Sequence, residues 1–305
     1  MTTPPINNIA LIGIGLINSS LARAVRLKNL SAHIAVADIN PDHLAMAQQI
    51  GLGHKYCRRN AEAVAEADLV IIGTPLGATA QVLQEISPHL KQGCIVTDVG
   101  SVKRCVVRDC AQFLPAHVFA IPGHPIAGTE HSGPAAGFAE LFQDRFCVLV
   151  NDLCADEYAR NTLENFWRAC GAIVEWMEAA HHDQVLAITS HLPHLIAYTI
   201  VGTATDLAKD LKQEVIRYSA SGFRDFTRIA ASDPTMWRDV FMTNRDAVLD
   251  ILQRFNEDLT HLQRAIRAGD AATLFDWFTR TRDIRRNIVS LKQHVPEDQK
   301  KTGQP

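Results

Sequence analysis

Residues 6–18 read INNIALIGIGLIN. The first seven of them predict a short buried strand, and the apolar pattern that follows predicts a helix starting at Leu16. Between strand and helix, Gly13 permits a tight turn. Gly15 lets the backbone approach a pyrophosphate, which a helix N-terminus stabilises. Together with Ile17, these residues predict a dinucleotide-binding turn.

The turn departs from the usual fingerprint at Asn18, where a third glycine is common. Asparagine tolerates unusual backbone angles, but its side chain would crowd the packing of helix against strand. Asp38 strengthens the prediction because it ends a second predicted strand, 32–37. A carboxylate there binds the ribose hydroxyls of NAD and repels the additional phosphate of NADP. We favour NAD as the cofactor over the alternative that Asp38 is the N-cap of the helix opened by Pro41.

Strands and helices alternate through the first half of the chain. Further strands are predicted at 68–73, 94–99 and 117–121, with helices near 76–87 and 103–114 between them. This alternation predicts an α/β fold, a Rossmann-type doubly wound parallel sheet with helices on both faces. Thr74 and Pro75 come at the carboxyl edge of that sheet, where ligands bind, so both are candidate cofactor contacts. A plain turn explains them equally well.

The second half is different in character. Strands are predicted at 146–150 and 172–176 around a helix near 156–169, and none beyond about residue 179. Helices are then predicted at 184–208, 236–267 and 270–293. We expect a nucleotide-binding domain at 1–178, an all-α substrate and dimerisation domain at 179–295, and a disordered tail at 296–305. The helix at 184–208 has no polar face, so we expect it to pack in a homodimer.

Composition narrows the class of protein. The chain has 305 residues, 47% hydrophobic and 21% charged, with a net charge of −3. This is typical of a soluble globular protein and gives no support to a nucleic-acid partner. Seven cysteines without a C-x-x-C pair suggest reduced thiols, and neither a signal peptide nor a membrane span is predicted. We therefore expect a cytoplasmic protein.

The candidate chemistry lies in residues 123–130, GHPIAGTE, a predicted loop with little propensity for helix or strand. His124 and Glu130 are candidates for proton transfer, since imidazole titrates near neutral pH. Ser101 follows another predicted strand at the same edge of the sheet. It is either the N-cap of the next helix or a hydroxyl that orients substrate and histidine.

These motifs resemble those of one enzyme family, the prephenate/arogenate (cyclohexadienyl) dehydrogenases of tyrosine biosynthesis. The matching segments, in the family's order, are GIGLI at 13–17, GSVK at 100–103, GHPIAGTEHSGP at 123–134, HD at 182–183, SHLPH at 190–194, GFRDFTRIA at 222–230 and SDPTMW at 232–237. Asn18 and the Ala220-Ser221 pair depart from the family's glycines.

The resemblance implies an NAD-dependent oxidative decarboxylation of prephenate or arogenate to 4-hydroxyphenylpyruvate or tyrosine. It implies that His124 accepts the proton of the substrate's C4 hydroxyl and that Ser101 bonds both that hydroxyl and His124. Arg228 would clamp a carboxylate, because guanidinium presents a bidentate fork.

Two further residues match family positions on the substrate side, Glu130 at the pocket entrance and His194. With Arg228 as the clamp, Asp225 would orient it, and Trp237 would pack near the site. Each has a plain alternative, such as a surface glutamate, a core tryptophan or an Asp225–Arg228 pair on one helix face. His191 and His194 could suggest a metal, but they have no acidic or cysteine partner at ligand spacing, so no metal is expected. We expect His181 and His182 to mark only a helix start.

Two other classes share the predicted layout. β-Hydroxyacid dehydrogenases and imine or pyrroline reductases also join a nucleotide domain to a helical domain. The β-hydroxyacid dehydrogenases use a lysine on the interdomain helix, whereas residues 182–201 carry histidines and no lysine. A non-catalytic NAD-binding regulator would have no need of the set Ser101, His124 and Arg228.

Overall fold

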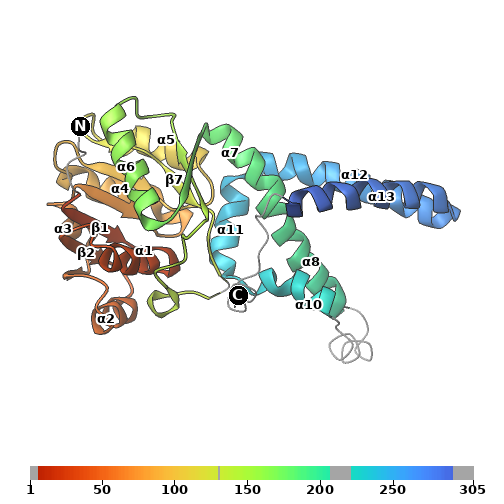
Figure 1. Cartoon of the computed structure of the whole chain (residues 1–305), viewed down its shortest axis with the longest axis horizontal. Helices are drawn as coiled ribbons and strands as arrows, with labels where there is room; N and C mark the ends of the chain where they lie inside the picture. Colours follow the sequence, from red (N-terminus) through yellow and green to blue (C-terminus); the bar gives the residue numbers. More distant parts are fainter. Residues whose placement is uncertain (1–5, 130, 207–220, 291–305) are drawn as a thin grey trace, which may run out of the picture. The chain divides into compact units, whose positions relative to one another are not determined.

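The computed structural model describes residues 6–129, 131–206 and 221–290, and it divides into two compact units, 1–249 and 250–305. A six-stranded sheet in the order β3-β2-β1-β4-β5-β6 forms the centre of the first unit (Figure 1). Its strands are β1 (Asn8–Ile12), β2 (His33–Ala37), β3 (Lys55–Cys57), β4 (Leu69–Ile72), β5 (Ile95–Asp98) and β6 (Phe119–Ala120). Every neighbouring pair is parallel, so the predicted Rossmann-type sheet is confirmed.

The sheet is buried on both faces. Along β1, Ile9 and Leu11 pack into one hydrophobic cluster, and Ala10 and Ile12 pack into a second. The first cluster includes α1 (Leu16–Leu27), α2 (Pro41–Gln49) and α6 (Glu157–Cys170). The second includes α3 (Asn60–Val64), α4 (Thr79–Ile86) and α5 (Arg104–Phe113). This explains the nearly continuous apolar strands, because side chains that point either way meet a helix layer.

A smaller sheet, β7-β8-β9, extends the first unit. It consists of β7 (Gly123–Pro125), β8 (Phe146–Val150) and β9 (Ile173–Met177), with β7 antiparallel to β8. The expectation that His124 lies in a loop was wrong, since His124 is the central residue of β7. Two backbone bonds flank the strand, Ile126 N–H to Phe146 O at 2.7 Å and Val150 N–H to Pro122 O at 2.9 Å. Proline is tolerated there because β7 is an edge strand.

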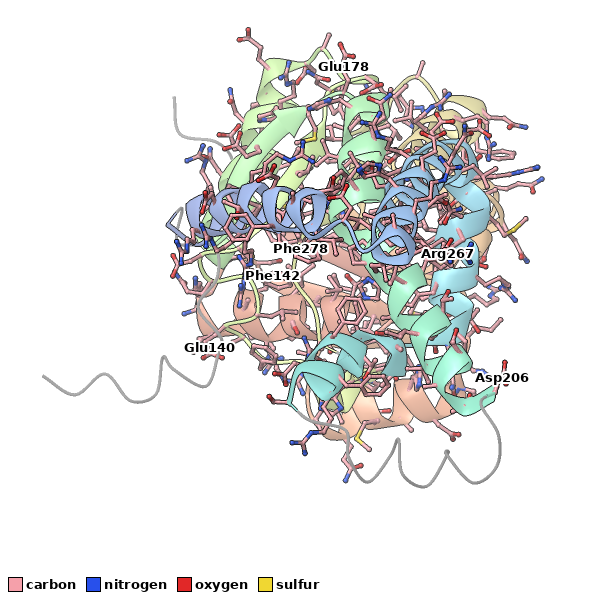
Figure 2. The ribbon with its side chains drawn as sticks, turned by 90° about the vertical axis from the view of Figure 1, so that its right-hand side faces the viewer. Glu140, Phe142, Glu178, Asp206, Arg267 and Phe278 are labelled. Atoms are coloured by element: carbon pink, nitrogen blue, oxygen red, sulfur yellow. The ribbon has the colours of Figure 1, made fainter. Side chains whose placement is uncertain are left out.

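A long helix, Ala179–Asp206, follows the small sheet, and Figure 2 shows it from beside Glu178 to Asp206. It consists of α7 (Ala179–Leu186), one π-helical turn (Ala187–His191) and α8 (Leu192–Asp206). The helix thus begins five residues before the predicted start at 184. The sequence gives a reason for the π turn. Pro193 has no N–H for the regular helical bond and its ring crowds the preceding turn.

By length and composition this helix could cross a membrane, with a mean hydropathy of 1.4. Its first half, however, buries polar groups that bond to the rest of the first unit, His182, Asp183 and His191. That half is therefore part of a protein core. Farther along, Ile188 and Ile200 are exposed in the single chain.

The remaining helices are α10 (Ser221–Thr227), a 3-10 turn (Arg228–Ala231), α11 (Pro234–Thr243), α12 (Arg245–Ala268) and α13 (Ala271–Ser290). The predicted helix 236–267 is in fact two, because Asn244 leaves the helical conformation at φ −103° and ψ 32°. Gly269, at φ 66°, makes the turn between α12 and α13. The predicted tail, 296–305, lies outside the described residues.

Candidate active site

His124 on β7 and His182 on α7 are joined by a hydrogen bond between His124 Nδ1 and His182 Nε2, 2.9 Å apart. His182 Nδ1 in turn lies 2.8 Å from Asp183 Oδ1. An ionised carboxylate only accepts, so His182 donates through Nδ1 and, when neutral, accepts at Nε2. His124 must then carry its proton on Nδ1. Its Nε2 is left as a lone pair, the form a general base requires.

Asp183 is held at the start of α5. Its Oδ1 accepts the backbone N–H of Lys103 at 2.7 Å, and its Oδ2 accepts that of Arg104 at 2.9 Å. The first N–H groups of a helix have no partner within the helix and favour a negative charge. The carboxylate therefore stays in place as an acceptor. The expectation that His182 only marks a helix start missed this chain of three side chains.

A buried ion pair holds the first residue of β7, Gly123, in place. Lys103 and Asp98 are 0% and 3% exposed, with Nζ 2.5 Å from Asp98 Oδ2. The same Nζ donates to Gly123 O at 2.6 Å, and Asp98 Oδ1 accepts the N–H of Gly123 at 3.1 Å. Because both backbone groups of Gly123 are engaged, the residue next to it, His124, has a fixed backbone.

His124 and His182 are both kept neutral. Burial lowers the pKa of His124 well below 6.5, and repulsion from a proton on His182, from the Lys103 ammonium and from a proton on His191 lowers it further. Burial also lowers the pKa of His182, against a raising effect of Asp183. A neutral His124 can accept a proton, and the nearby carboxylate can stabilise the cation that results.

Two further histidines of the long helix, His191 and His194, pack against Trp237 of α11. The His194 ring stacks on Trp237 with 3.6 Å between centroids, and the His191 ring meets it edge-on at 6.1 Å. Trp237 is 6% exposed, so the prediction of a core tryptophan and that of a site residue both fit its position. Within the residues described, no group of His, Cys, Asp and Glu could hold a metal ion.

Arg228 begins the 3-10 turn after α10, and its charge contributes, after burial, to lowering the pKa of His194. The structure thus brings Arg228 and His194 to one region. Asp225 is exposed on α10. Glu130 lies outside the described residues.

Ser101 follows β5 but is not the helix N-cap, because α5 begins at Arg104 with Lys103 as its N-cap. Its turn is fixed by Gly100 N–H, which donates to Asp98 Oδ2 at 2.8 Å. Burial lowers the pKa of the His191 ring to about 4, and the backbone of Ser101, a hydrogen-bond partner of that ring, opposes this shift, so Ser101 lies next to His191. This position leaves the predicted role of its hydroxyl open.

The glycine turn fits a dinucleotide. Gly13 has φ +77°, and a Cβ there would lie 2.8 Å from Gly73 O, so only glycine is compatible. Gly15, the N-cap of α1, faces open space, and Leu16 and Ile17 form the first turn of that helix. Its N-terminus carries no acidic residue, which suits a bound phosphate.

Asp38 is bound to this turn. Its Oδ2 accepts the N–H of Ile14 at 2.8 Å, and its Oδ1 accepts that of Asn40 at 2.8 Å. The N-cap of α2 is Asn40, so the alternative reading of Asp38 does not hold. A carboxylate fixed beside the glycine turn matches the ribose-binding position. Thr74 and Pro75 follow β4, and Thr74 Oγ1 is buried without a partner among the described residues.

Asn18 does not crowd the packing as the sequence suggested. Its Nδ2 donates to the carbonyls of Ile12, Gly13 and Ile71, at 3.1, 2.8 and 3.3 Å. Gly73 provides the room, since a Cβ there would lie 2.5 Å from Asn18 Nδ2. The side chain therefore ties the ends of β1 and β4 together from a regular helical position.

Comparison with known proteins decides the family. The prephenate dehydrogenase nucleotide-binding domain matches residues 21–176, and the prephenate dehydrogenase dimerization domain matches residues 178–280. The chain belongs to the prephenate dehydrogenase family. The fold predicted from the sequence, a nucleotide-binding sheet domain followed by a helical dimerisation domain, is confirmed by these matches.

Individual members of the family are similar over nearly the whole chain. The cyclohexadienyl dehydrogenase of Zymomonas mobilis is 40% identical over 278 residues, 91% of this chain and 94% of that protein. Prephenate dehydrogenase from Aquifex aeolicus, solved with hydroxyphenyl propionate and NAD+, is 29% identical with a TM-score of 0.87, covering 94% of this chain and all of that one.

The arogenate dehydrogenase of Synechocystis is 25% identical with a TM-score of 0.76, covering 92% of this chain and 99% of that one. With these relatives, the prediction of an oxidoreductase of the prephenate/arogenate type, in the biosynthesis of tyrosine, is confirmed. The predicted cofactor, NAD, is the one that the Aquifex relative binds.

Sequence reasoning missed several residues of the site. Asp183 and Lys103 were quoted only as parts of motifs, Asp98 only fell within a predicted strand, and Asn244 was not singled out at all. A usable signal was present in His182-Asp183, because an acceptor next to a histidine can fix its tautomer. Nothing in the sequence indicates that Asp98 and Lys103 are paired, because their contact depends on the path of the turn between β5 and α5.

Proposed function

We propose that the enzyme oxidises prephenate or arogenate at C4 with loss of carbon dioxide, and that His124 is its general base. The observation that carries this proposal is the chain His124–His182–Asp183, which leaves His124 Nε2 unprotonated. NAD+, when bound, accepts the hydride that leaves C4. The bond from C1 to the ring carboxylate breaks, its electron pair enters the ring, and carbon dioxide leaves an aromatic product.

The proton of the C4 hydroxyl goes to His124 Nε2 as the hydride leaves, and His124 returns it to the phenolate oxygen of the product once carbon dioxide has left. The imidazolium that forms is stabilised through His182 by Asp183, a contribution to general base catalysis of about 10²–10⁴ in rate. Ser101, in the turn after β5, would hold the hydroxyl against His124. The residues that suit NAD are the turn Gly13 and Gly15 with Leu16 and Ile17, and Asp38 for the ribose, with Thr74 and Pro75 at the sheet edge.

The carboxylates of the substrate lie at the other end of the pocket. Arg228 is the proposed clamp for a carboxylate, with His194 beside it, since the charge of Arg228 acts on the His194 ring. Trp237 supports His194 by stacking at 3.6 Å. Asp225 would orient Arg228, and Glu130 would stand at the entrance of the pocket.

We further propose that the enzyme works as a homodimer in the cytoplasm. Apolar side chains are exposed in the single chain, Ile188 at 54% and Ile200 at 39% on the long helix of the first unit. In the second unit Leu259, Phe275 and Phe278 are exposed, the last drawn in Figure 2. A second copy would cover such surfaces. We also propose that the boundary between the nucleotide-binding and the helical domain lies at residue 178. A monomer mass measured by light scattering would contradict the dimer.

The test of the function is NADH formation measured with prephenate and with arogenate separately. We expect turnover on at least one, and kcat for His124→Asn lower by at least about 100-fold with NAD+ affinity unchanged. No turnover on either substrate would reject the function. NAD+ binding without any turnover would point to the regulator, and turnover of a β-hydroxyacid or an imine to the other enzyme class. A normal kcat for His124→Asn would reject this base.

A further inference from the structure

Helix α11 is bonded to the long helix at both of its ends. Just before α11, the carbonyl of Ser232 accepts the Tyr198 hydroxyl at 2.8 Å. Just after it, Asn244 Nδ2 donates to the carbonyl of Asp183 at 2.9 Å. Tyr198 belongs to α8 and Asp183 to α7, so both bonds go to the helix that carries the histidines of the site. These two bonds fix the position of α11 relative to those histidines.

A third bond joins the middle of α11 to the sheet domain. Asp239 Oδ2 accepts the N–H of Gly77 at 3.1 Å, although 162 positions separate the two residues. Gly77 lies in a 3-10 turn, Leu76–Ala78, directly after Thr74 and Pro75 at the carboxyl edge of the sheet. Asp239 is 8% exposed, and a hydrogen bond to a carboxylate is stronger than one between neutral groups. This bond therefore connects the nucleotide-binding domain to the helical domain.

The absence of a side chain at Gly77 is what lets the carboxylate come this close. A Cβ at position 77 would lie 2.9 Å from Asp239 Oδ2 and 3.3 Å from its Cγ. The φ of Gly77 lies outside the left-handed region, so the conformation of the turn does not call for glycine. The close approach of Asp239, and not the backbone of the turn, is thus the reason for a glycine at this position.

The 3-10 turn that Asp239 holds packs against the turn that carries Ser101. Leu76, next to Gly77, is 9% exposed, and a Cβ at Gly100 would lie 2.6 Å from Leu76 Cδ2. Gly100 is therefore in direct contact with Leu76, and Ser101 is the residue that follows it. Asp239 thus supports two turns at the edge of the sheet, the one after β4 and the one after β5.

Helix α11 also reaches the substrate side of the pocket. Trp237, two residues before Asp239, stacks on the His194 ring with 3.6 Å between centroids. Trp237 and Val240 are buried in one hydrophobic cluster with Leu76, and α11 packs against the 3-10 turn. The helix therefore stands between His194 and the carboxyl edge of the sheet, where ligands of such sheets bind.

From this geometry we propose that Asp239 is a positioning residue, which sets the distance between substrate and cofactor through its bond to Gly77. The inference rests on the proposed function and adds to it a residue that acts without touching either ligand. Arg228 and His194, which hold the substrate in that function, belong to the helical domain, whereas the cofactor turn belongs to the sheet domain. Hydride transfer needs the reacting atoms about 3–3.5 Å apart, and a displacement of about 1 Å can lower the rate about 100-fold. A bond between the two domains controls that distance.

Four substitutions test the bond from both of its sides. Asp239→Ala removes the acceptor, and Asp239→Asn keeps an oxygen for the N–H of Gly77 while it loses the charge. Gly77→Ala pushes an intact carboxylate away, and because position 77 is exposed, this variant should fold. Arg238→Gln removes the ion pair of Arg238 with Asp239 Oδ1, in which two nitrogens lie 2.9 and 2.7 Å from that oxygen. Asp250→Ala and Asp250→Asn, at an exposed carboxylate of α12, are the matched controls.

Each full-length variant is assayed for kcat, KM and the dissociation constants of NAD+ and of the product, with kcat expressed per NAD+ binding site. Asp239→Ala and Gly77→Ala should lower this kcat about 100-fold and change KM and both dissociation constants by no more than about threefold. Asp239→Asn and Arg238→Gln should stay within about tenfold of the wild type. Hydrogen exchange at residues 76–78 gives a readout apart from activity, since it should become faster in Asp239→Ala and stay the same in Asp239→Asn.

A normal kcat per NAD+ site in Asp239→Ala would show a loss of folded protein only and overturn the proposal. A change confined to KM or to a dissociation constant would overturn it as well, because Asp239 would then act on binding. Equal losses in Asp239→Asn and Asp239→Ala would show that the charge matters and the bond to Gly77 does not. Unchanged hydrogen exchange in Asp239→Ala would show that the bond is not formed in solution. A wild type without turnover on prephenate or arogenate would instead reject the proposed function.

Discussion

The backbone N–H of Lys103 donates to Asp183 Oδ1 at 2.7 Å, although 80 positions separate the two residues in the chain. The start of α5, in the nucleotide-binding sheet domain, thereby holds the carboxylate that fixes the tautomers of His182 and His124. The side chain of the same lysine holds β7 through Gly123. One residue thus sets both the position and the protonation of the proposed base.

Asp183→Asn should reduce kcat by about 10²–10⁴. An amide offers one acceptor oxygen to the three N–H groups of His182, Lys103 and Arg104, and it removes the charge that stabilises the imidazolium. NAD+ affinity, measured by fluorescence, should stay the same. Asp276→Asn, at an exposed carboxylate of α13, is the control and should keep full activity. Retention of kcat in Asp183→Asn would contradict the role of this chain of residues.

The acid limb of kcat/KM should lie below pH 6.5. Burial first, and then neighbouring charges, lower the pKa of His124 well below that ordinary value. Because the base works unprotonated, a lowered pKa preserves activity to lower pH, and activity is lost only as pH falls through that pKa. The measurement is kcat/KM from pH 4 to 9, with each sample returned to pH 7.5 to show that any loss of activity is not unfolding. A limb at or above 6.5 would show that His124 is not held neutral.

Breaking the buried pair should be costly for stability. Lys103→Met leaves the carboxylate of Asp98 buried without a cation, and we expect about 3–5 kcal/mol less free energy of unfolding. Adding Asp98→Asn should restore part of this loss, so the two changes should not be additive in urea denaturation. The exposed pair Arg59–Glu62, 74% and 46% exposed, is the control and should contribute no more than about 1 kcal/mol. Strict additivity for Lys103 and Asp98 would contradict the prediction.

Asp38→Ser should weaken the preference for NAD over NADP. The substitution removes a charge that favours ribose hydroxyls and repels a phosphate, and loss of a charged hydrogen bond corresponds to about 10–100-fold in affinity. The ratio of kcat/KM for the two cofactors gives the readout, and Asp42→Ser, on the exposed side of α2, is the control. An unchanged ratio would show that Asp38 only braces Ile14 and Asn40.

The sequence predicted the elements whose signals are local and repeated. Strands such as Leu69–Ile72 and the glycine turn at Gly13 follow from apolar runs and steric rules that act within a few residues. It did not predict β7, because a three-residue strand with a glycine and a proline has no periodicity to detect. His124 and Arg228 came from matching motifs, whereas the partners of His124 needed three distant segments to come together.

The π turn and the break at Asn244 were missed for a related reason. Both interrupt apolar helix patterns without a change in composition, so the periodicity continues across them. Pro193 is the one residue in the sequence that indicates the π turn. The role of Asn244 follows from its contacts with Asp183 and His191, which the sequence does not show. Local irregularities of this kind leave the apolar periodicity unchanged, so the sequence pattern does not reveal them.

Asn18 and Gly73 place a joint constraint on how this protein can vary. A methyl group at position 73 would collide with the Asn18 amide at 2.5 Å, whereas glycine at position 18 would free the space and lose three hydrogen bonds. Gly73→Ala should therefore be harmful alone and tolerated together with Asn18→Gly. The room that a third glycine would give in the nucleotide fingerprint is provided here by Gly73, directly after β4, so the order in which these two mutations occur decides whether the intermediate protein is stable.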